Sequence, residues 1–111
     1  MILEDVFEKY KDEYLKFEKV SPKHDNGRST GEMAEGFFKN LHSRPDVCAF
    51  IFLHLLVGGE GDMISAAEHD EIWLDVDCGK LSKVASEEDI LYLVRCGIRY
   101  NKGTDSLCMF V

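Results

Sequence analysis

The residues that could do chemistry are concentrated in AEHDEIWLDVD, which spans residues 67–77. This stretch holds one histidine, five carboxylates and the only tryptophan of the chain. Carboxylate oxygens suit hard cations such as magnesium, and a histidine beside carboxylates suits manganese, iron or zinc. The alternative is that the acidic side chains form the solvent-facing half of a strand, as sheets with one buried face commonly do.

Apolar and polar residues alternate from residue 71 to residue 77, which predicts a half-buried strand. Its apolar face comprises Ile72, Leu74 and Val76. If the strand extends back to residue 69, its polar face carries four candidate metal ligands, which are His69, Glu71, Asp75 and Asp77. Neighbours on one face of a strand lie roughly 7 Å apart, too far to chelate one ion without a further element. The sequence identifies no such element, so we predict neither metal nor cofactor here.

The same polar face could instead contact a protein. Trp73 lies among its carboxylates, and an aromatic anchor surrounded by charge is typical of a binding surface. The residues that we expect to contact a partner are Glu71, Trp73, Asp75 and Asp77.

Elsewhere, two residues of types that are often catalytic, His54 and Cys78, lack the neighbouring groups that catalysis would need. His54 stands alone in an apolar run, where a histidine is more often a core residue with one hydrogen bond, or a residue at the edge of the core, than a catalytic group. Cys78 follows the acidic strand with no basic neighbour that would make its thiol nucleophilic. We therefore predict no catalytic residue and favour a protein that is not an enzyme.

Composition narrows the class of partner and the compartment. The net charge is −8, and no stretch concentrates enough positive charge to follow a nucleic-acid backbone. An acidic surface fits a partner with a basic surface. The four cysteines are too widely spaced for a zinc ribbon. Three of them lie beside apolar residues, where a free cysteine acts as a small hydrophobic residue, so we expect a reducing, cytoplasmic compartment. The longest apolar run, residues 47–57, is about half the length that a membrane-spanning helix needs, so no membrane association is expected.

The first half of the sequence predicts helices. Apolar residues recur every three or four positions over residues 3–17, and a second apolar face follows a capping box at Ser29 and Glu32. These two helices are expected to form a hairpin. Residues 47–57 are apolar nearly all round and begin after Pro45, which favours a buried helix, with a buried strand as the alternative.

The second half predicts a small sheet. A short helical turn with Leu81 and Val84 inward follows the acidic strand, and Ser86 then caps a helix that ends at Gly97. Two predicted strands, joined by the loop 101–105, then form a C-terminal antiparallel hairpin. The fold class is therefore α+β in a single domain over residues 1–111: N-terminal helices packed on an antiparallel sheet of at least three strands, with one helix inserted before a C-terminal β-hairpin.

The final strand, residues 106–111, is apolar on both faces. It must be covered on both faces, or it must lie at a sheet edge where it could pair with a second copy in a homodimer.

The segments SAAEHDEIWLDVD and SEEDILYLVRCGIRYNKGTDSLCMFV, within residues 64–111, resemble small uncharacterised proteins of bacteriophages and prophages. In that group an acidic AEHDEI strand precedes a CG-x-R-Y and D-S-L ending. The resemblance implies a bacterial cytoplasm and a small accessory protein that modulates host machinery, without assigning an activity. The sequence therefore predicts an acidic interaction protein that binds a host protein, with a metal-dependent enzyme or metal-binding protein using residues 69–77 as the alternative.

Overall fold

Four antiparallel strands form one sheet in the order β1-β2-β4-β3. The computed structural model describes residues 1–17 and 44–110. Its strands are β1 (Ile64–Glu68), β2 (Glu71–Leu74), β3 (Arg99–Asn101) and β4 (Ser106–Phe110). The α+β class and the C-terminal hairpin, formed by β3 and β4, are confirmed. The second predicted helix, with its capping box at Ser29, lies outside the described residues.

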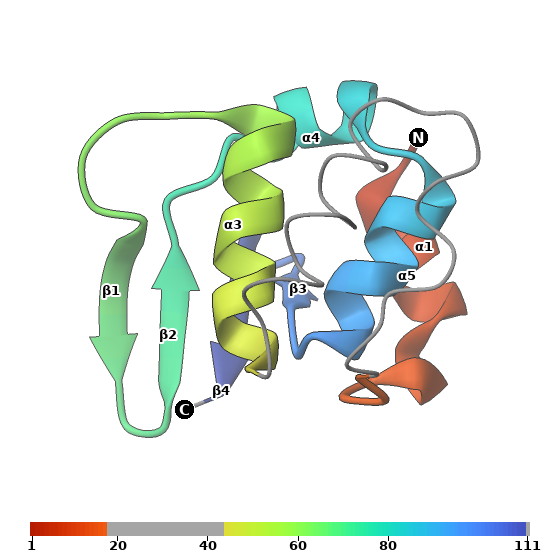
Figure 1. Ribbon diagram of the computed structural model, residues 1–111, viewed down its shortest axis with the longest axis horizontal. Coiled ribbons are helices and arrows are strands. Elements are labelled where there is room, and N and C mark those ends of the chain that lie inside the picture. Colours follow the sequence, from red (N-terminus) through yellow and green to blue (C-terminus); the bar gives the residue numbers. More distant parts are fainter. Residues whose placement is uncertain (18–43, 111) are drawn as a thin grey trace.

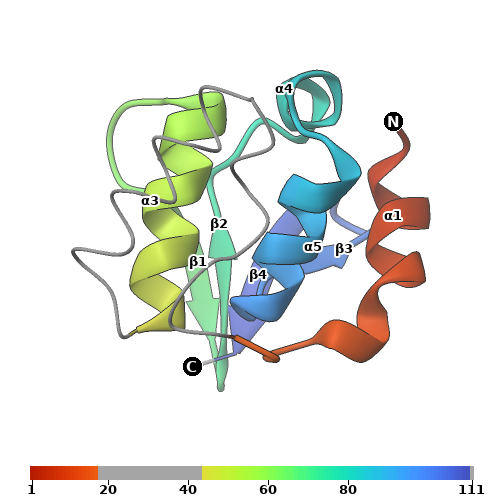
Figure 2. The same ribbon diagram turned by 45° about the vertical axis from the view of Figure 1, so that its right-hand side comes forward.

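Helices cover one face of this sheet. Figures 1 and 2 show α4 across one end of the molecule, and Figure 2 shows α3 and α5 in front of the sheet, with α1 beside α5 and β3. The helices are α1 (Leu3–Lys9), α3 (Pro45–Val57), α4 (Cys78–Val84) and α5 (Glu87–Arg95), and a short 3-10 helix, η1, spans Lys11–Glu13. The predicted N-terminal helix over residues 3–17 is therefore shorter than expected. It ends at Lys9, and the chain continues as η1.

Residues 47–57 form a helix, as the sequence favoured. Pro45 occupies the first turn of α3, where its missing N–H costs no hydrogen bond, and Gly58 ends the helix at φ 72°. Phe52 and Leu53 are fully buried, whereas His54 and Leu55 face solvent. The expectation that His54 belongs to the core or its edge is therefore wrong.

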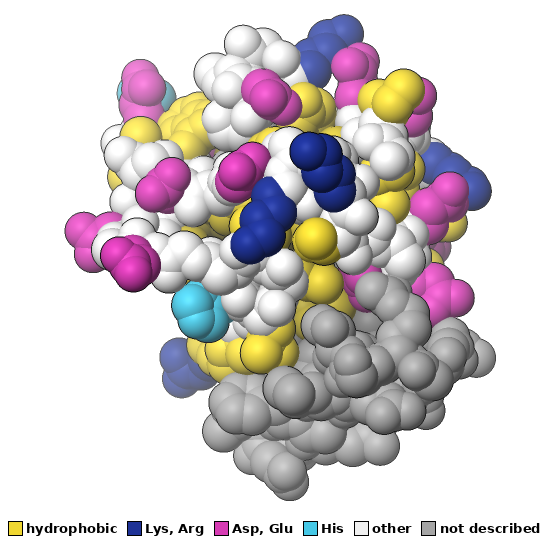
Figure 3. Space-filling model, turned by 90° about the horizontal axis from the view of Figure 1, so that it is seen from above, with side chains coloured by type: hydrophobic (Ala, Val, Ile, Leu, Met, Phe, Trp, Pro, Cys, Tyr) yellow, Lys and Arg dark blue, Asp and Glu magenta, His cyan; other side chains and the backbone are white. Residues whose placement is uncertain are grey.

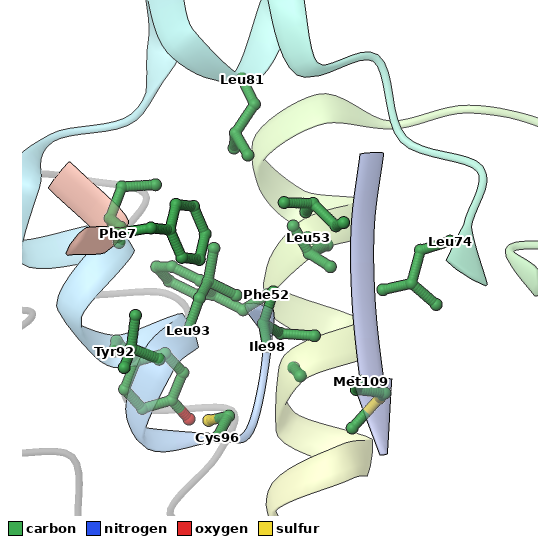
Figure 4. Packing of buried hydrophobic residues seen from close by; sticks show 14 of the residues in the cluster. Phe7, Phe52, Leu53, Leu74, Leu81, Tyr92, Leu93, Cys96, Ile98 and Met109 are labelled. Atoms are coloured by element: carbon green, nitrogen blue, oxygen red, sulfur yellow. The ribbon is translucent and has the colours of Figure 1, made fainter. Parts of the chain in front are cut away.

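The core lies between the helical layer and the inner face of the sheet. Figure 4 shows Phe52 and Leu53 of α3 meeting Leu93 of α5, with Leu74 and Met109 entering from the sheet. The rings of Phe52 and Tyr92 meet edge to face with centroids 4.9 Å apart. Side chains from both layers therefore interdigitate, which fixes how the helices sit on the strands.

Helix α5 has the capping box that its sequence indicates. The Ser86 side chain accepts from the Asp89 backbone N–H at 3.2 Å, and the Asp89 carboxylate accepts from the Ser86 N–H at 2.9 Å. Asp89 is itself only 1% exposed. At the other end, Gly97 has φ 99°, as expected for a residue that stops a helix.

Two further expectations need correction. Val84 of α4 is 42% exposed and does not point inward, although Leu81 is fully buried as predicted. Strand β4 is not an edge strand, because it pairs with β2 on one side and with β3 on the other. Pairing of β4 with a second copy would therefore require one of these neighbours to separate from it.

Candidate functional site

The strand register brings together side chains that are far apart in sequence. Paired residues of an antiparallel sheet point to the same side. Four pairs point away from the core: Glu71 with Phe110, Trp73 with Cys108, Arg99 with Cys108, and Glu68 with Glu71. We call the side formed by Glu68, Glu71, Trp73, Arg99, Cys108 and Phe110 the outer face. The helices of Figure 2 lie on the other side of the sheet.

An ion pair joins two strands across the outer face. Arg99 of β3 donates from Nη1 to a carboxylate oxygen of Glu71 on β2. The Arg99 guanidinium also lies over the Phe110 ring of β4, with 4.3 Å from Cζ to the ring centroid. The side chains of the ion pair are partly buried, with Arg99 38% exposed and Glu71 20% exposed. The guanidinium is thus held from two sides, in the cation–π and planar hydrogen-bonding geometry that arginine favours.

Trp73 lies at the middle of the outer face and is half-buried. Its neighbours in register are Ala66 on β1 and Cys108 on β4. Its Nε1 is shielded from solvent and has no hydrogen-bond partner among the described residues. Cys108 is fully buried between Trp73 and Arg99, and burial raises the pKa of its thiol.

A hollow of about 470 Å³ opens beside Trp73 at the β1–β2 turn. Its lining residues are Glu68, His69, Asp70, Glu71, Trp73 and Phe110. Phe110, the last residue of β4, is 53% exposed and is thus one of the large apolar side chains that the fold leaves at the surface. The hollow therefore combines two aromatic rings with three carboxylates.

The acidic strand is shorter than the alternation predicted, so the four metal candidates do not share a strand face. His69 and Asp70 form the turn before β2, with His69 at φ 56° and its side chain 89% exposed. Asp75 follows the end of β2, and Asp77 is the N-cap of α4, where it accepts from the Lys80 N–H at 3.0 Å. Within residues 1–17 and 44–110, no three histidine, cysteine or acidic side chains are grouped so that they could hold a metal ion.

The interaction residues are likewise divided. Glu71 and Trp73 lie on the outer face, as expected, and Asp75 is exposed beyond the strand end. Asp77 belongs to the start of α4. The residues that the sequence did not single out are Glu68, Asp70, Phe110 and Arg99. Glu68 and Asp70 reach the hollow through the β1–β2 turn, whereas the register of β4 between β2 and β3 brings Phe110 to the hollow and Arg99 to Glu71.

The cysteines are free and buried. Burial, with a smaller effect of Asp105 and Asp77, raises the pKa of Cys78 to about 11. A thiol with this pKa is protonated at neutral pH, so Cys78 lacks the thiolate character of a nucleophile. Burial also raises the pKa of Cys48 and Cys96.

Other surfaces carry charge of both signs. Figure 3 looks down on the end of the molecule near α4, where acidic side chains surround a few lysine or arginine side chains. In the part of the chain that the structure describes, no helix has the length and apolar character to cross a bilayer. No protein-family model, curated protein or solved structure matches the chain. The outer face and its hollow are therefore the features from which a function can be inferred.

Proposed function

We propose that this chain is a small, acidic, cytoplasmic interaction domain that binds a basic protein surface through the hollow beside Trp73. The observation that carries the proposal is the exposed Phe110 ring beside Trp73, with Glu68, Asp70 and Glu71 around them. An exposed aromatic cluster on a soluble domain commonly marks a binding surface. The resemblance of residues 64–111 to phage proteins supports a bacterial host protein as the partner.

The chemistry of the hollow favours an arginine or lysine side chain as its occupant. A cation above Trp73 or Phe110 gains cation–π attraction, and the surrounding carboxylates can accept its hydrogen bonds. Glu71 is already paired with Arg99, which leaves Glu68 and Asp70 as the carboxylates most available to a partner. A net charge of −8 also speeds the approach of a basic partner.

Trp73 supplies the readout, because it is the only tryptophan in the chain. Its fluorescence should be titrated with a hexa-arginine peptide and with a hexaglycine peptide at low and at 0.5 M salt. We expect a saturable change with hexa-arginine that weakens at high salt, since screened charges attract less, and no change with hexaglycine.

Two charge reversals test whether the change comes from the hollow. Glu68→Lys with Asp70→Lys should weaken hexa-arginine binding at least about tenfold, because two attractive carboxylates become repulsive. Glu60→Lys is the matched control, since Glu60 is exposed in the loop between α3 and β1 and lies outside the hollow. Equal binding by the double variant and by the wild-type chain would overturn the proposal.

The partner itself can be sought by affinity capture from a bacterial lysate. Wild-type protein, the double variant and Glu60→Lys should be compared as baits. A candidate partner is one that the wild-type and Glu60→Lys baits retain and that the double variant loses. If every captured protein is retained equally by all three baits, the hollow is not the binding surface.

A further inference from the structure

A second cavity shares Phe110 with the hollow but is lined by different charged groups. It is a cleft of about 500 Å³ between the N-terminal segment and the β3 edge of the sheet. Its apolar surface includes Phe7, Tyr14, Ile98 and Phe110. The volume lies in the range of small-molecule sites, which are commonly apolar with a few polar groups that orient the ligand.

Three cationic side chains line this cleft, and each has a glutamate as its ion-pair partner. Lys11, Arg99 and Lys102 line it together with two glutamates, Glu4 and Glu8. Lys11 pairs with Glu8 at 2.7 Å and Lys102 with Glu4 at 3.6 Å. Both lysines are more than 60% exposed, and exposed pairs of this kind contribute little and exchange partners readily.

Arg99 is the group that could hold an anion in place. The guanidinium has five N–H donors. Within residues 1–17 and 44–110, only one of them, on Nη1, has a hydrogen-bond acceptor, which is Glu71. The stack on Phe110 and the Glu71 pair fix the guanidinium plane at the wall of the cleft. A preorganised guanidinium with donors to spare recognises planar carboxylates well.

We propose that this cleft binds a small aromatic carboxylate, with its ring between Tyr14, Ile98 and Phe110 and its carboxylate on Arg99. Lys11 and Lys102 also line the cleft, and either can contact the carboxylate by exchanging its glutamate partner for the ligand. The acidic hollow beside Trp73 would repel the same ligand, so the two cavities select ligands of opposite charge.

The test compares two probes of the same shape. 2-Naphthoate and 2-naphthamide differ by the negative charge, and each should be titrated into isotope-labelled protein while backbone amide NMR signals are recorded. We expect the largest shifts at Lys11, Tyr100 and Phe110, and naphthoate binding about tenfold or more tighter than naphthamide, as expected for a hydrogen bond to a charged group.

Variants then assign the preference to Arg99. Arg99→Gln should remove most of the difference between the two probes, and Lys11→Gln should reduce it by a smaller factor. Lys83→Gln is the control, because Lys83 is an exposed lysine on α4 outside the cleft. If Arg99→Gln is unfolded by circular dichroism, Arg99→Lys takes its place and should retain a reduced preference.

Several results would overturn this proposal. They are equal affinity of the wild-type chain for the two probes, shifts confined to residues outside the cleft, and no binding of naphthoate at 5 mM. The hexa-arginine titration of Trp73 uses neither Lys11 nor naphthoate, so failure of one proposal leaves the other open to its own test.

Discussion

Arg95 donates two hydrogen bonds to one oxygen of Glu13, from Nε at 3.0 Å and from Nη2 at 2.7 Å, although 82 positions separate them in sequence. These hydrogen bonds connect η1, which contains Glu13, to the C-terminal end of α5, which contains Arg95. A second ion pair, Lys9 with Glu87 at 2.8 Å, fastens α1 to the start of the same helix. The N-terminal segment is therefore held along the length of α5, and it forms one wall of the cleft that contains Tyr14.

The Glu13 contact makes stability depend on pH. The hydrogen bonds from Arg95 lower the pKa of Glu13, so the folded chain holds the charged carboxylate more strongly than the unfolded chain does. This contribution is fully present above the unfolded pKa of about 4.3 and is lost as the pH falls through the folded pKa. We expect Glu13→Gln to lower the melting temperature at pH 7 and to have a smaller effect at pH 3. Glu60→Gln should show no such change between the two pH values, and an equal effect of Glu13→Gln at both would contradict the prediction.

The orientation of α3 can be tested with two alanine substitutions on neighbouring turns. Phe52 is fully buried, so Phe52→Ala should reduce the free energy of unfolding by about 3–5 kcal/mol. Leu55 is 36% exposed, so Leu55→Ala should change it by no more than about 0.5 kcal/mol. Urea unfolding measures both. Similar losses for the two variants would mean that α3 does not present Phe52 to the core.

The capping box of α5 should contribute measurably to stability. Ser86→Ala removes the acceptor of the Asp89 N–H and should reduce the free energy of unfolding by about 1 kcal/mol. Ser86→Thr keeps a hydroxyl acceptor and should lose less. The comparison uses chemical unfolding of the three proteins under one condition, and an equal loss for alanine and threonine would show that the side-chain hydrogen bond is not the cause.

The buried thiols should be unreactive while the chain is folded. Burial raises the pKa of Cys78 to about 11 and also raises the pKa of Cys48 and Cys108. At pH 8 we therefore expect a thiol reagent such as 5,5′-dithiobis(2-nitrobenzoate) to react slowly with native protein and to reach all four cysteines once urea unfolds it. Rapid reaction of native protein would contradict the burial of at least one thiol.

The sequence predicted those helices and strands whose ends are marked by capping, proline or glycine residues nearby in the chain. Helix α5 has the N-cap Ser86 before it and Gly97 after its end, and α3 has Pro45 as its first residue and Gly58 directly after its end. The hairpin of β3 and β4 was also predictable, because the turn between them is polar and glycine-containing. Each of these signals acts within a few residues, so a single sequence is enough to detect it.

Strand β1 was not predicted, for a physical reason. All five of its residues are exposed, so its sequence has no alternation between a buried and a wet face. It is a strand because β2 pairs with it, after a turn in which His69 adopts a positive φ that glycine or asparagine more often provides. Pairing between segments, and not the pattern within residues 64–68, determines this strand.

The candidate site was predicted only in part for the same reason. Alternation placed Glu71 and Trp73 on one face, and this is confirmed. It could not distinguish a strand that continues to Asp77 from a strand that stops at Leu74 and leaves Asp77 to cap a helix, because an acidic residue suits either role. The position of Phe110 beside Trp73 depends on strand order, which a local pattern does not specify.

The order of the strands also determines when the sheet can form during synthesis. Strand β4 is the link between the β1–β2 hairpin and β3, yet residues 106–110 are translated after every other described strand. Until they leave the ribosome, β2 and β3 have no common neighbour, and the inner residues of α3 and α5 lack part of the surface that covers them. We therefore expect this domain to acquire protease resistance in one step after residue 110 has left the ribosome, and not progressively as the preceding residues emerge.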